Sequence, residues 1–452
     1  MNTIHEPARD LPLVEDCDVC VLGGSCTGVF AAVAASRMGA RACVVEACGF
    51  FGGMATAGLV SIWHSTLDTN FERQIIAGLT TEVIERLQKR GGVTVFTRNP
   101  DRHCVLNTEE LKIELDELTR EAGVRPFLHT RFCAPIIDSG RLDAVAIEDK
   151  TGRRAIRAKV FIDATGDGDL VARMGLPCET RPRLQPPTTC MILRGIQTLA
   201  RKRPDFSWPA MLRAADLPPS AQRGFLWTAH VPGASDDTLV AGTRMVDVDC
   251  SDADALTAAE IEGRRQTRAL CDAIRAFEPN LPESLLANLP AHVGVRETRH
   301  ARCVHRVTEQ EVLTGFRFPD AIANGTYRVD IHHSEKPGLT FRYLDGREVY
   351  VVPGEKLQEG RWRPQTAENP AFYQVPYRAL VPQGARNVLV AGRLMDADRG
   401  AYGALRVMVN CNQTGQAAGC AAALAAQRGI SVADVPAAAL RDVLRSQNAV
   451  II

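Results

Sequence analysis

Asp330 and His332 have the residue types and spacing needed for proton transfer. They stand in the segment YRVDIHH (327–333), which has the composition of a strand. Because side chains two residues apart in a strand share a face, Asp330 lies on the side of His332, and only one of His332 and His333 can face inward. A carboxylate that orients an imidazole favours general-base chemistry near neutral pH. We therefore predict that His332 is a catalytic base.

Arginines in two other segments could bind an anion. Arg296 and Arg299 flank Glu297 in the segment VRETR. This spacing favours an internal ion-pair network, and the alternative is that the arginines bind a carboxylate or hydroxyl of a substrate. Arg406 follows the loop after Asp396 and could reach a bound molecule, with a structural ion pair as the alternative. Arg296 and Arg406 join the candidate catalytic residues.

Residues 17–46 have the pattern that positions a dinucleotide. An apolar strand, a glycine-rich turn, a small-residue helix and a second strand ending in Glu46 form a βαβ unit. Gly23 permits the tight turn and Gly28 lets the helix pack closely, whereas Ser25 replaces the usual middle glycine with a hydroxyl that can donate to a phosphate. Glu46 can accept both ribose hydroxyls and would repel a 2′-phosphate, which predicts FAD or NAD rather than NADP. A glycine-rich turn in another α/β fold is the alternative.

A glycine-rich loop, GFFGGMATAGLVSIWHST (49–66), comes after Glu46. Its glycines permit the backbone to approach a ligand, and its position suggests contact with the rest of the cofactor. His64 would then lie near the reactive end of that ligand, where Trp63 could stack on a flat ring. A histidine with only a packing role is the alternative. His64 is the fourth candidate catalytic residue.

The segment 158–175 again brings the end of a strand and the start of a helix together, with two glycines between them. Asp167 or Asp169 could cap this helix. The functional interpretation places Thr165 and Gly166 against the dinucleotide.

The segment 385–429, near the end of the chain, again has a strand followed by a turn and a helix. A strand at 388–391 leads through a Gly-Arg turn and an irregular loop with Asp396 to a small-residue helix from about Thr414. Such a helix can pack closely against a sheet or a cofactor. We expect the first and last segments to form one discontinuous domain.

The predicted fold is α/β, with a discontinuous Rossmann-like domain and a second, mixed α+β lobe. Between the two ends of the chain, proline and arginine are more frequent and the loops are longer, so we expect mixed or antiparallel sheets and a surface for the substrate. The expected parts are 1–176, 177–375 and 376–452, with helices at 71–90, 107–122 and 257–277 and strands within 124–148.

Composition excludes several classes of function. The chain has 452 residues, 23% of them charged, and a formal net charge of zero, which gives no electrostatic reason to expect nucleic acid. No apolar run is long enough for a membrane span, and the first residues lack the features of a signal peptide, so we expect a cytoplasmic protein. No HExxH, GxSxG or spaced Cys/His quartet occurs, and we expect no metal.

The 14 cysteines are scattered along the chain, as is typical of buried small hydrophobes. Cys17 and Cys20 form a CxxC in the first predicted strand, where residues three apart point to opposite faces and cannot share a metal or a disulfide. Cys26 lies at a helix N-terminus, where a thiolate is favoured. Without a partner thiol in that motif, a disulfide-reductase role is not indicated.

Four blocks in this order give the chain a family resemblance: GFFGGMATAG, FIDATGDGDL, HVGVRETR and VAGRLMDADRGAYGALRVM with TGQAAG. They resemble the FAD-dependent oxidoreductase family of the glutathione-reductase-2 structural class, over roughly residues 17–430. Nicotinamide enzymes need no late cofactor block, so the resemblance implies FAD. One departure is Arg399, where the family favours histidine.

The resemblance also implies which residues hold FAD. The adenosine half would meet the first turn and Glu46, the late block would meet the ribityl chain or pyrophosphate, and the last helix would point its N-terminus at the flavin. The implied cofactor residues are Gly23, Gly24, Ser25, Cys26, Thr27, Gly28, Glu46, Gly52, Gly53, Met54, Thr165, Gly166, Asp167, Gly392, Arg393, Asp396, Thr414, Gly415, Gln416 and Ala417.

These expectations combine into a flavoenzyme that oxidises a small or medium polar organic substrate by hydride transfer, with a histidine base. One alternative is a flavin-dependent hydratase or isomerase without net redox change, and another is a non-catalytic subunit that FAD stabilises. No second dinucleotide unit occurs, so the electron acceptor is oxygen, a quinone, a redox protein or NAD(P) bound transiently. The oligomeric state stays open, with a homodimer among the arrangements.

Overall fold

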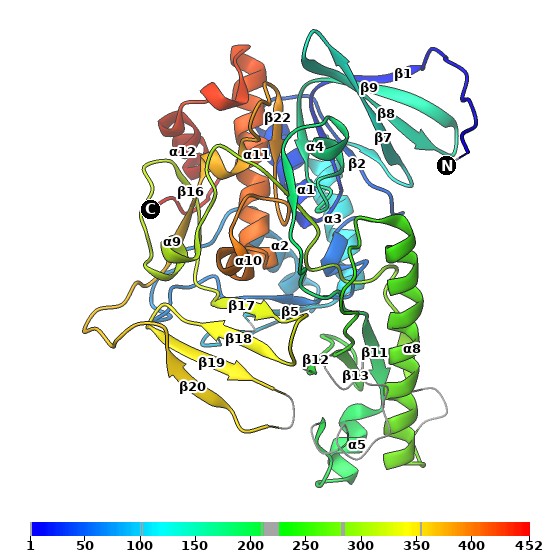
Figure 1. Cartoon of the computed structure of the whole chain (residues 1–452), viewed down its shortest axis with the longest axis vertical. Coiled ribbons are helices and arrows are strands. Elements are labelled where there is room, and N and C mark those ends of the chain that lie inside the picture. The colour runs from blue at the N-terminus through cyan, green and yellow to red at the C-terminus, as the bar shows by residue number, and fades with distance from the viewer. Residues whose placement is uncertain are drawn as a thin grey trace.

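A computed structural model describes residues 2–99, 101, 103–208, 211, 226–281, 285–352 and 355–452. Its central sheet has the order β6-β2-β1-β9-β8-β7, and β22 pairs with the C-terminal end of β9 (Figure 1). β1, β2, β6, β9 and β22 run parallel, whereas β8 is antiparallel to both of its neighbours, β7 and β9. The strands are β1 (Leu13–Leu22), β2 (Ala42–Val45), β6 (Arg125–Phe127), β7 (Arg131–Asp138), β8 (Arg141–Asp149), β9 (Gly152–Asp163) and β22 (Val388–Val390). This sheet confirms the predicted Rossmann-like α/β fold.

Two helices from opposite ends of the sequence, α1 (Cys26–Arg37) and α11 (Met408–Arg428), lie side by side against this sheet (Figure 1). A Cβ atom at Gly415 would overlap the carbonyl oxygen of Thr27, and one at Gly419 would overlap that of Ala31. Only glycine therefore allows the two backbones to come this close. The contact fixes the start of α11 beside the dinucleotide turn.

Most of the remaining strands belong to smaller antiparallel sheets, as the sequence predicts for the middle of the chain. These strands are β3 (Ile62–Trp63), β4 (Val93–Val95), β5 (Cys104–Leu106), β10 (Cys178–Thr180), β11 (Cys190–Arg194), β12 (Trp227–His230), β13 (Asp237–Ala241), β14 (Leu286–Asn288), β15 (Arg299–Ala301), β16 (Ala321–Gly325), β17 (Val329–His332), β18 (Leu339–Arg342), β19 (Arg347–Val351), β20 (Gln358–Arg361) and β21 (Tyr373–Pro376). The sheet β17-β18-β19-β20 lies at one end of the molecule, beside α10 (Figure 1).

The other helices cover the sheets or connect them. They are α2 (Leu79–Lys89), α3 (Thr108–Glu121), α4 (Asp169–Arg173), α5 (Ile196–Lys202), α8 (Ala253–Phe277), α9 (Glu309–Leu313), α10 (Arg399–Leu405) and α12 (Ala437–Ser446). The predicted helices at 107–122 and 257–277 agree with α3 and α8. Among the described residues, no helix combines the length and the apolar composition that a membrane crossing requires.

Two predicted helices have different bounds in the structure. The helix expected from residue 71 begins at Leu79, because Phe71 and Gly78 both have positive φ angles that a helix does not allow. The helix expected from about Thr414 begins at Met408, where burial and side-chain hydrogen bonds stabilise a polar first turn of weak helix propensity. The expected domain boundary after residue 375 falls inside β21, and the domain division itself stays a prediction.

The prediction that Cys17 and Cys20 point to opposite faces is wrong. The thiols of Cys17 and Cys43 lie 3.6 Å apart, and Cys20 pairs with Cys43 across the two strands. The amides of Asp18 and Val19 both donate to the Arg41 carbonyl, the pattern of a bulge, which resets the alternation of side chains. Burial and the neighbouring thiol raise the pKa of Cys17, so this cluster stays protonated. All cysteines are free, and the described residues contain no group arranged to hold a metal ion.

The α1–α11 contact predicts a large effect for a small substitution. Gly415→Ala adds one methyl group against the backbone of α1, and we expect it to lower the free energy of unfolding by about 3 kcal/mol. Gly360→Ala is the matched control, because a Cβ at Gly360 has nothing within 4 Å, and its effect should stay within about 0.5 kcal/mol. Urea unfolding of the two variants measures both values, and equal effects would contradict the close contact.

Candidate active site

Asp330 and His332 lie at the centre of a buried polar cluster on β17. His332 Nε2 is 3.2 Å from Asp330 Oδ1, and Asp330 Oδ2 accepts hydrogen bonds from Tyr327 (2.9 Å) and Arg406 (3.1 Å). Both Asp330 and His332 are less than a tenth exposed. Pairing of β17 with β18 fixes the strand, and α10 packs directly on it, because a Cβ at Gly403 would lie 2.7 Å from the Asp330 carbonyl oxygen.

The charges in this cluster determine its protonation. Burial opposes ionisation of Asp330, but His332 and Arg406 outweigh it and hold the pKa of Asp330 well below its usual value. Burial lowers the pKa of His332 well below 6.5, and Arg296 and Arg244 act in the same direction, whereas Asp330 acts against them. Asp330 is therefore ionised and His332 neutral near pH 7. The carboxylate 3.2 Å from Nε2 favours the tautomer with its proton on Nε2, which leaves the Nδ1 lone pair available; among the described residues Nδ1 has no hydrogen-bond partner.

Arg296 and Arg244 meet beside this pair. Both guanidinium groups donate to Thr188 Oγ1, and Arg296 also donates to the Pro186 carbonyl at 2.6 Å. Burial lowers the pKa of Arg244 to about 10 and lowers that of Arg296, and each of them is further lowered by neighbouring arginines. Sequence analysis missed Arg244, because nothing in its local pattern marks a site.

The segment VRETR contributes to an internal ion-pair network, which is the interpretation that its sequence favoured, but Arg296 is not part of this network. Glu297 pairs with Arg181 and with His300 (3.1 Å), and Arg299 pairs with Asp169 (3.1 Å). Arg406 forms the ion pair with Asp330 that was the alternative for it. Arg299 and Arg406 are thus committed to carboxylates, whereas Arg296 donates to neutral oxygens.

His64 lies on the ring of Tyr327, with the ring centres 4.1 Å apart. The two rings are tilted by 56°, and because Tyr327 donates to Asp330, this ring contact connects His64 to the same cluster. Burial lowers the pKa of His64 to about 4, so its ring is neutral. Trp63 is fully buried, and its indole N–H has no partner among the described residues. The structure therefore brings the four candidate catalytic residues together, and their catalytic roles stay predictions.

The first turn has the shape that a dinucleotide requires. Gly23 has a φ of 100°, and a Cβ on it would lie 2.6 Å from the carbonyl carbon of Ala164. Ser25 caps α1 by accepting from the Gly28 amide at 3.4 Å, which leaves its O–H free to donate. Each oxygen of Glu46 accepts one backbone N–H, from Gly24 (2.7 Å) or from residue 48 (2.8 Å), and keeps a lone pair for a ribose hydroxyl.

The glycine-rich loop closes onto this turn. The Gly52 amide donates to the Gly24 carbonyl at 2.9 Å, and a Cβ on Gly53 would lie 2.6 Å from that of Ser25. Met54 follows in a short 3-10 turn. Cys26 donates to the Gly52 carbonyl, and burial raises the pKa of Cys26 to about 12, so the thiolate expected at this helix start does not form. The glycines therefore line the dinucleotide turn, as a cofactor cradle requires.

The cap of α4 differs from the prediction. Asp163, at the end of β9, accepts from the amides of Leu170 and Val171, and neither Asp167 nor Asp169 caps the helix. Thr165 donates to Asp163. Asp167 instead accepts from Arg393 at 2.8 Å. The guanidinium of Arg393 covers Gly166, where a Cβ would lie 2.8 Å from it. The two predicted cofactor segments thus meet at this ion pair.

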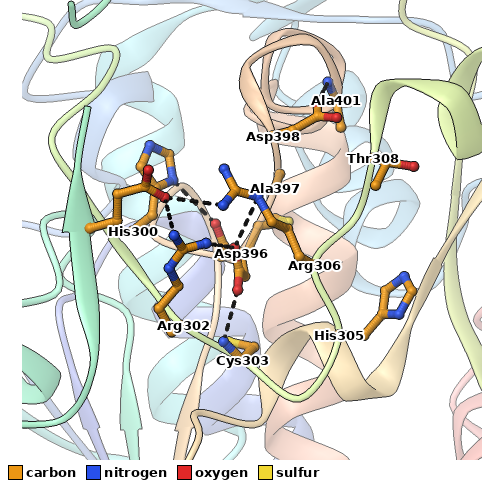
Figure 2. Close-up of polar contacts among 12 residues, drawn as sticks. His300, Arg302, Cys303, His305, Arg306, Thr308, Asp396, Ala397, Asp398 and Ala401 are labelled. Atoms are coloured by element: carbon orange, nitrogen blue, oxygen red, sulfur yellow. Dashed lines mark hydrogen bonds and ion pairs between the residues drawn. The ribbon is translucent and has the colours of Figure 1, made fainter. Parts of the chain in front are cut away.

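Asp396 is engaged by other parts of the protein. Its carboxylate accepts from the Cys303 amide at 3.0 Å, and the guanidinium groups of Arg302 and Arg306 lie 3.7 Å away (Figure 2). Glu179 balances the two arginines. Arg399, where the resembled family favours histidine, pairs with Glu335 at 3.1 Å. These contacts give both side chains structural roles.

The predicted cofactor residues of helix α11 contact different parts of the protein. Thr414 accepts from the Gly392 amide at 3.0 Å, which connects the late turn to the helix. Gln416 bonds Leu79 and Gln447 on the other side, and Ala417 lies in the apolar core, so the geometry does not support cofactor contacts for these two.

One buried amide on α11 had no signal in the sequence. Asn412 precedes Gly415 by three residues and so shares the face that meets α1. It is 1% exposed, and neither amide atom has a partner among the described residues. An orphaned amide beside the dinucleotide turn fits a hydrogen bond to a bound cofactor.

The cradle, the carboxylate and the late turn together match the family that the sequence resembles. The sequence model described as FAD dependent oxidoreductase matches residues 18–444. The chain belongs to the FAD-dependent oxidoreductase family. FAD is therefore its cofactor, and the free hydrogen-bonding groups of Ser25 and Glu46 in the first βαβ unit fit it. When bound, FAD supplies a two-electron acceptor.

Several solved structures contain chains that are similar to this one at low identity. A geranylgeranyl bacteriochlorophyll reductase-like protein of Thermoplasma acidophilum is 12% identical, with a TM-score of 0.47, over 96% of this chain and 83% of that chain. The flavin-dependent brominase Bmp2 is 12% identical, with a TM-score of 0.46, over 94% and 83%. A glycerol-3-phosphate dehydrogenase of Bacillus halodurans, complexed with FAD, is 15% identical, with a TM-score of 0.40, over 64% and 58%. No curated protein matches the sequence.

Glu46 gives a direct test of the cofactor cradle. Glu46→Gln loses the charge that accepts the ribose hydroxyls, and we expect the Kd of the apoprotein for FAD to rise about 10- to 100-fold, the usual range for a hydrogen bond to a charged group. Flavin fluorescence quenching measures the Kd. Glu359→Gln, at an exposed position of β20, is the control and should leave it unchanged. An unchanged Kd in Glu46→Gln contradicts the assignment.

His64 gives a pH-dependent prediction. Its pKa is about 6.5 when unfolded and about 4 when folded, so the unfolded state binds the extra proton between these values. The free energy of unfolding should therefore fall as pH drops from 6.5 toward 4. We expect His64→Asn to remove about 2 kcal/mol of that loss. This is less than the full pKa shift would give, because solvent screens the partly exposed side chain. Urea unfolding at both pH values measures this, and equal losses with and without His64 would contradict it.

Proposed function

We propose that this enzyme dehydrogenates a small or medium polar organic substrate, with His332 as the base. The observation that carries the proposal is the buried, neutral His332, whose Nε2 faces an ionised carboxylate and whose Nδ1 has no partner among the described residues. FAD, held by the first turn and Glu46, would accept a hydride from a substrate C–H bond, and the substrate O–H or N–H proton would go to His332 Nδ1. The substrate is oxidised by two electrons and the cofactor is reduced by two.

Each neighbour of His332 supports this role. Asp330 orients the ring and stabilises the imidazolium that forms when the proton arrives. Arg406 and Tyr327 keep Asp330 ionised and in place. The low pKa of His332 keeps the base unprotonated into the acidic range. The cycle closes when oxygen, a quinone, a redox protein or NAD(P) reoxidises the cofactor.

A hydratase or isomerase could use the same base, so the test must detect the redox change. We expect anaerobic mixing of the holoenzyme with a panel of alcohols, amines and acids to bleach the flavin absorbance with the true substrate. Conversion of a substrate while the flavin stays oxidised would support the non-redox alternative. A protein that contains no flavin when isolated, and that binds none when FAD is added, would contradict the whole proposal.

The base itself is tested by substitution. His332→Asn should slow anaerobic flavin reduction by about 10²- to 10⁴-fold, the usual contribution of general-base catalysis, while FAD content is retained. In the wild-type enzyme the acid limb of the pH profile should lie below pH 6.5, because burial lowers the pKa of His332. His305→Asn is the control, since His305 pairs with Glu311 and should not affect the rate. Equal rates in both variants would contradict the assignment of the base and would support a non-catalytic role for this cluster.

A further inference from the structure

Beside His332, Arg296 is a cation that has no carboxylate partner among the described residues. Asp330, the carboxylate that acts on Arg244 and Arg296, is already paired with Arg406 and His332. The described residues place no carboxylate within 4 Å of Arg296. A buried guanidinium is costly unless it is paired, so this arrangement is suited to an anion that arrives from outside.

The hydrogen bonds of Arg296 show the same feature. Its guanidinium donates to the Pro186 carbonyl and to Thr188 Oγ1, which are neutral oxygens. Thr188 also accepts from Arg244, so one hydroxyl holds two cationic side chains next to each other. Each guanidinium presents its N–H donors in a plane, and carboxylates match that geometry.

Further donors in the cluster are unused. Gln185 Nε2 and Arg406 Nε are buried and have no hydrogen-bond partner among the described residues. Two hydrogen bonds hold Gln185 beside the base. Its backbone N–H donates to Glu297 at 2.9 Å, and its side-chain oxygen accepts from the backbone N–H of His332. The surroundings of His332 are therefore rich in donors.

A small cavity reaches this cluster from the side of the sheet β17-β18. It is lined by Arg244, His332 and Lys336, together with residues that follow His332 and with Pro186 and Val246. A third cationic side chain at its wall favours the entry of an anion. The cavity thus reaches Arg244 and His332, and Arg296 lies next to Arg244 through their shared contact with Thr188.

We propose that the substrate carries a carboxylate, which Arg296 and Arg244 bind while His332 takes the proton from a nearby hydroxyl or amino group. The proposal rests on the proposed function, since it names the substrate class of the same site. The substrate is then a hydroxy or amino acid, because the anion and the reacting group must fit one small molecule between the arginines and His332.

The test uses the holoenzyme and pairs of probes that differ only in charge. Acetate, lactate, malonate and succinate are compared with their amides at constant ionic strength, by the shift of the flavin absorbance and by the melting temperature. We expect at least one acid to bind, and its amide to bind about 10- to 100-fold more weakly, the range for a lost charged hydrogen bond. Acids that bind no better than their amides overturn the proposal.

Substitutions locate the anion. Arg296→Gln and Arg244→Gln should each weaken acid binding by about 10- to 100-fold with FAD content retained. Arg296→Lys keeps the charge but loses the planar fork, and should recover binding only in part. Arg194→Gln is the matched control, because this exposed arginine already pairs with Asp237, and its binding of acids should equal that of the wild type. Unchanged binding in both glutamine variants overturns the proposal.

A second source of the anion is the cofactor itself, through its phosphates or its reduced ring. If Arg296→Gln weakens FAD binding to the apoprotein, or shifts the flavin reduction potential, while the acids bind as before, the arginines serve the cofactor and the proposal is wrong. These measurements distinguish failure of the carboxylate proposal from failure of the proposed function. An acid that binds through Arg296 without bleaching the flavin contradicts only dehydrogenation, whereas bleaching by a neutral alcohol with no acid binding contradicts only the carboxylate.

Discussion

The close contact between α1 and α11 is the constraint on which the site depends. Glycine at 415 and 419 lets two helices from opposite ends of the chain meet backbone to backbone. The start of α11 is thereby fixed beside the dinucleotide turn, and α10, just before it, packs through Gly403 on β17. Two glycine contacts in series thus connect the cofactor turn to the strand that carries Asp330 and His332. A shift at either contact would move the base relative to the cofactor.

Burial gives the cluster on β17 its chemistry. In water a histidine near pH 6.5 would be partly charged, but the surrounding arginines and the low polarity of the site keep His332 neutral. The same burial makes Asp330 dependent on Arg406 and Tyr327 for its charge. The cluster therefore combines an available proton acceptor with an excess of cations, and these two properties suit oxidation of an anionic substrate.

The sequence predicted the features that local rules control. The βαβ unit, the strand at 388–390 and the shared face of Asp330 and His332 follow from alternation and glycine placement, and the structure has all three. It did not predict features set by tertiary contacts. The bulge at Asp18 places Cys17 and Cys20 on the same face instead of opposite faces. Asp163 caps α4 in place of Asp167 or Asp169, which the sequence had suggested. Arg244 and Asn412 gave no signal, since only the folded chain brings them to the site.

The central claim is that substrate oxidation and flavin reduction are one event that His332 assists. A single anaerobic turnover, with a substrate deuterated at the reacting carbon, tests it most directly. The account predicts one product molecule for each flavin reduced, and a slower reduction with deuterium because that C–H bond breaks in the same step. Product formed while the flavin stays oxidised, or retention of every deuterium atom at that carbon in the product, would contradict it.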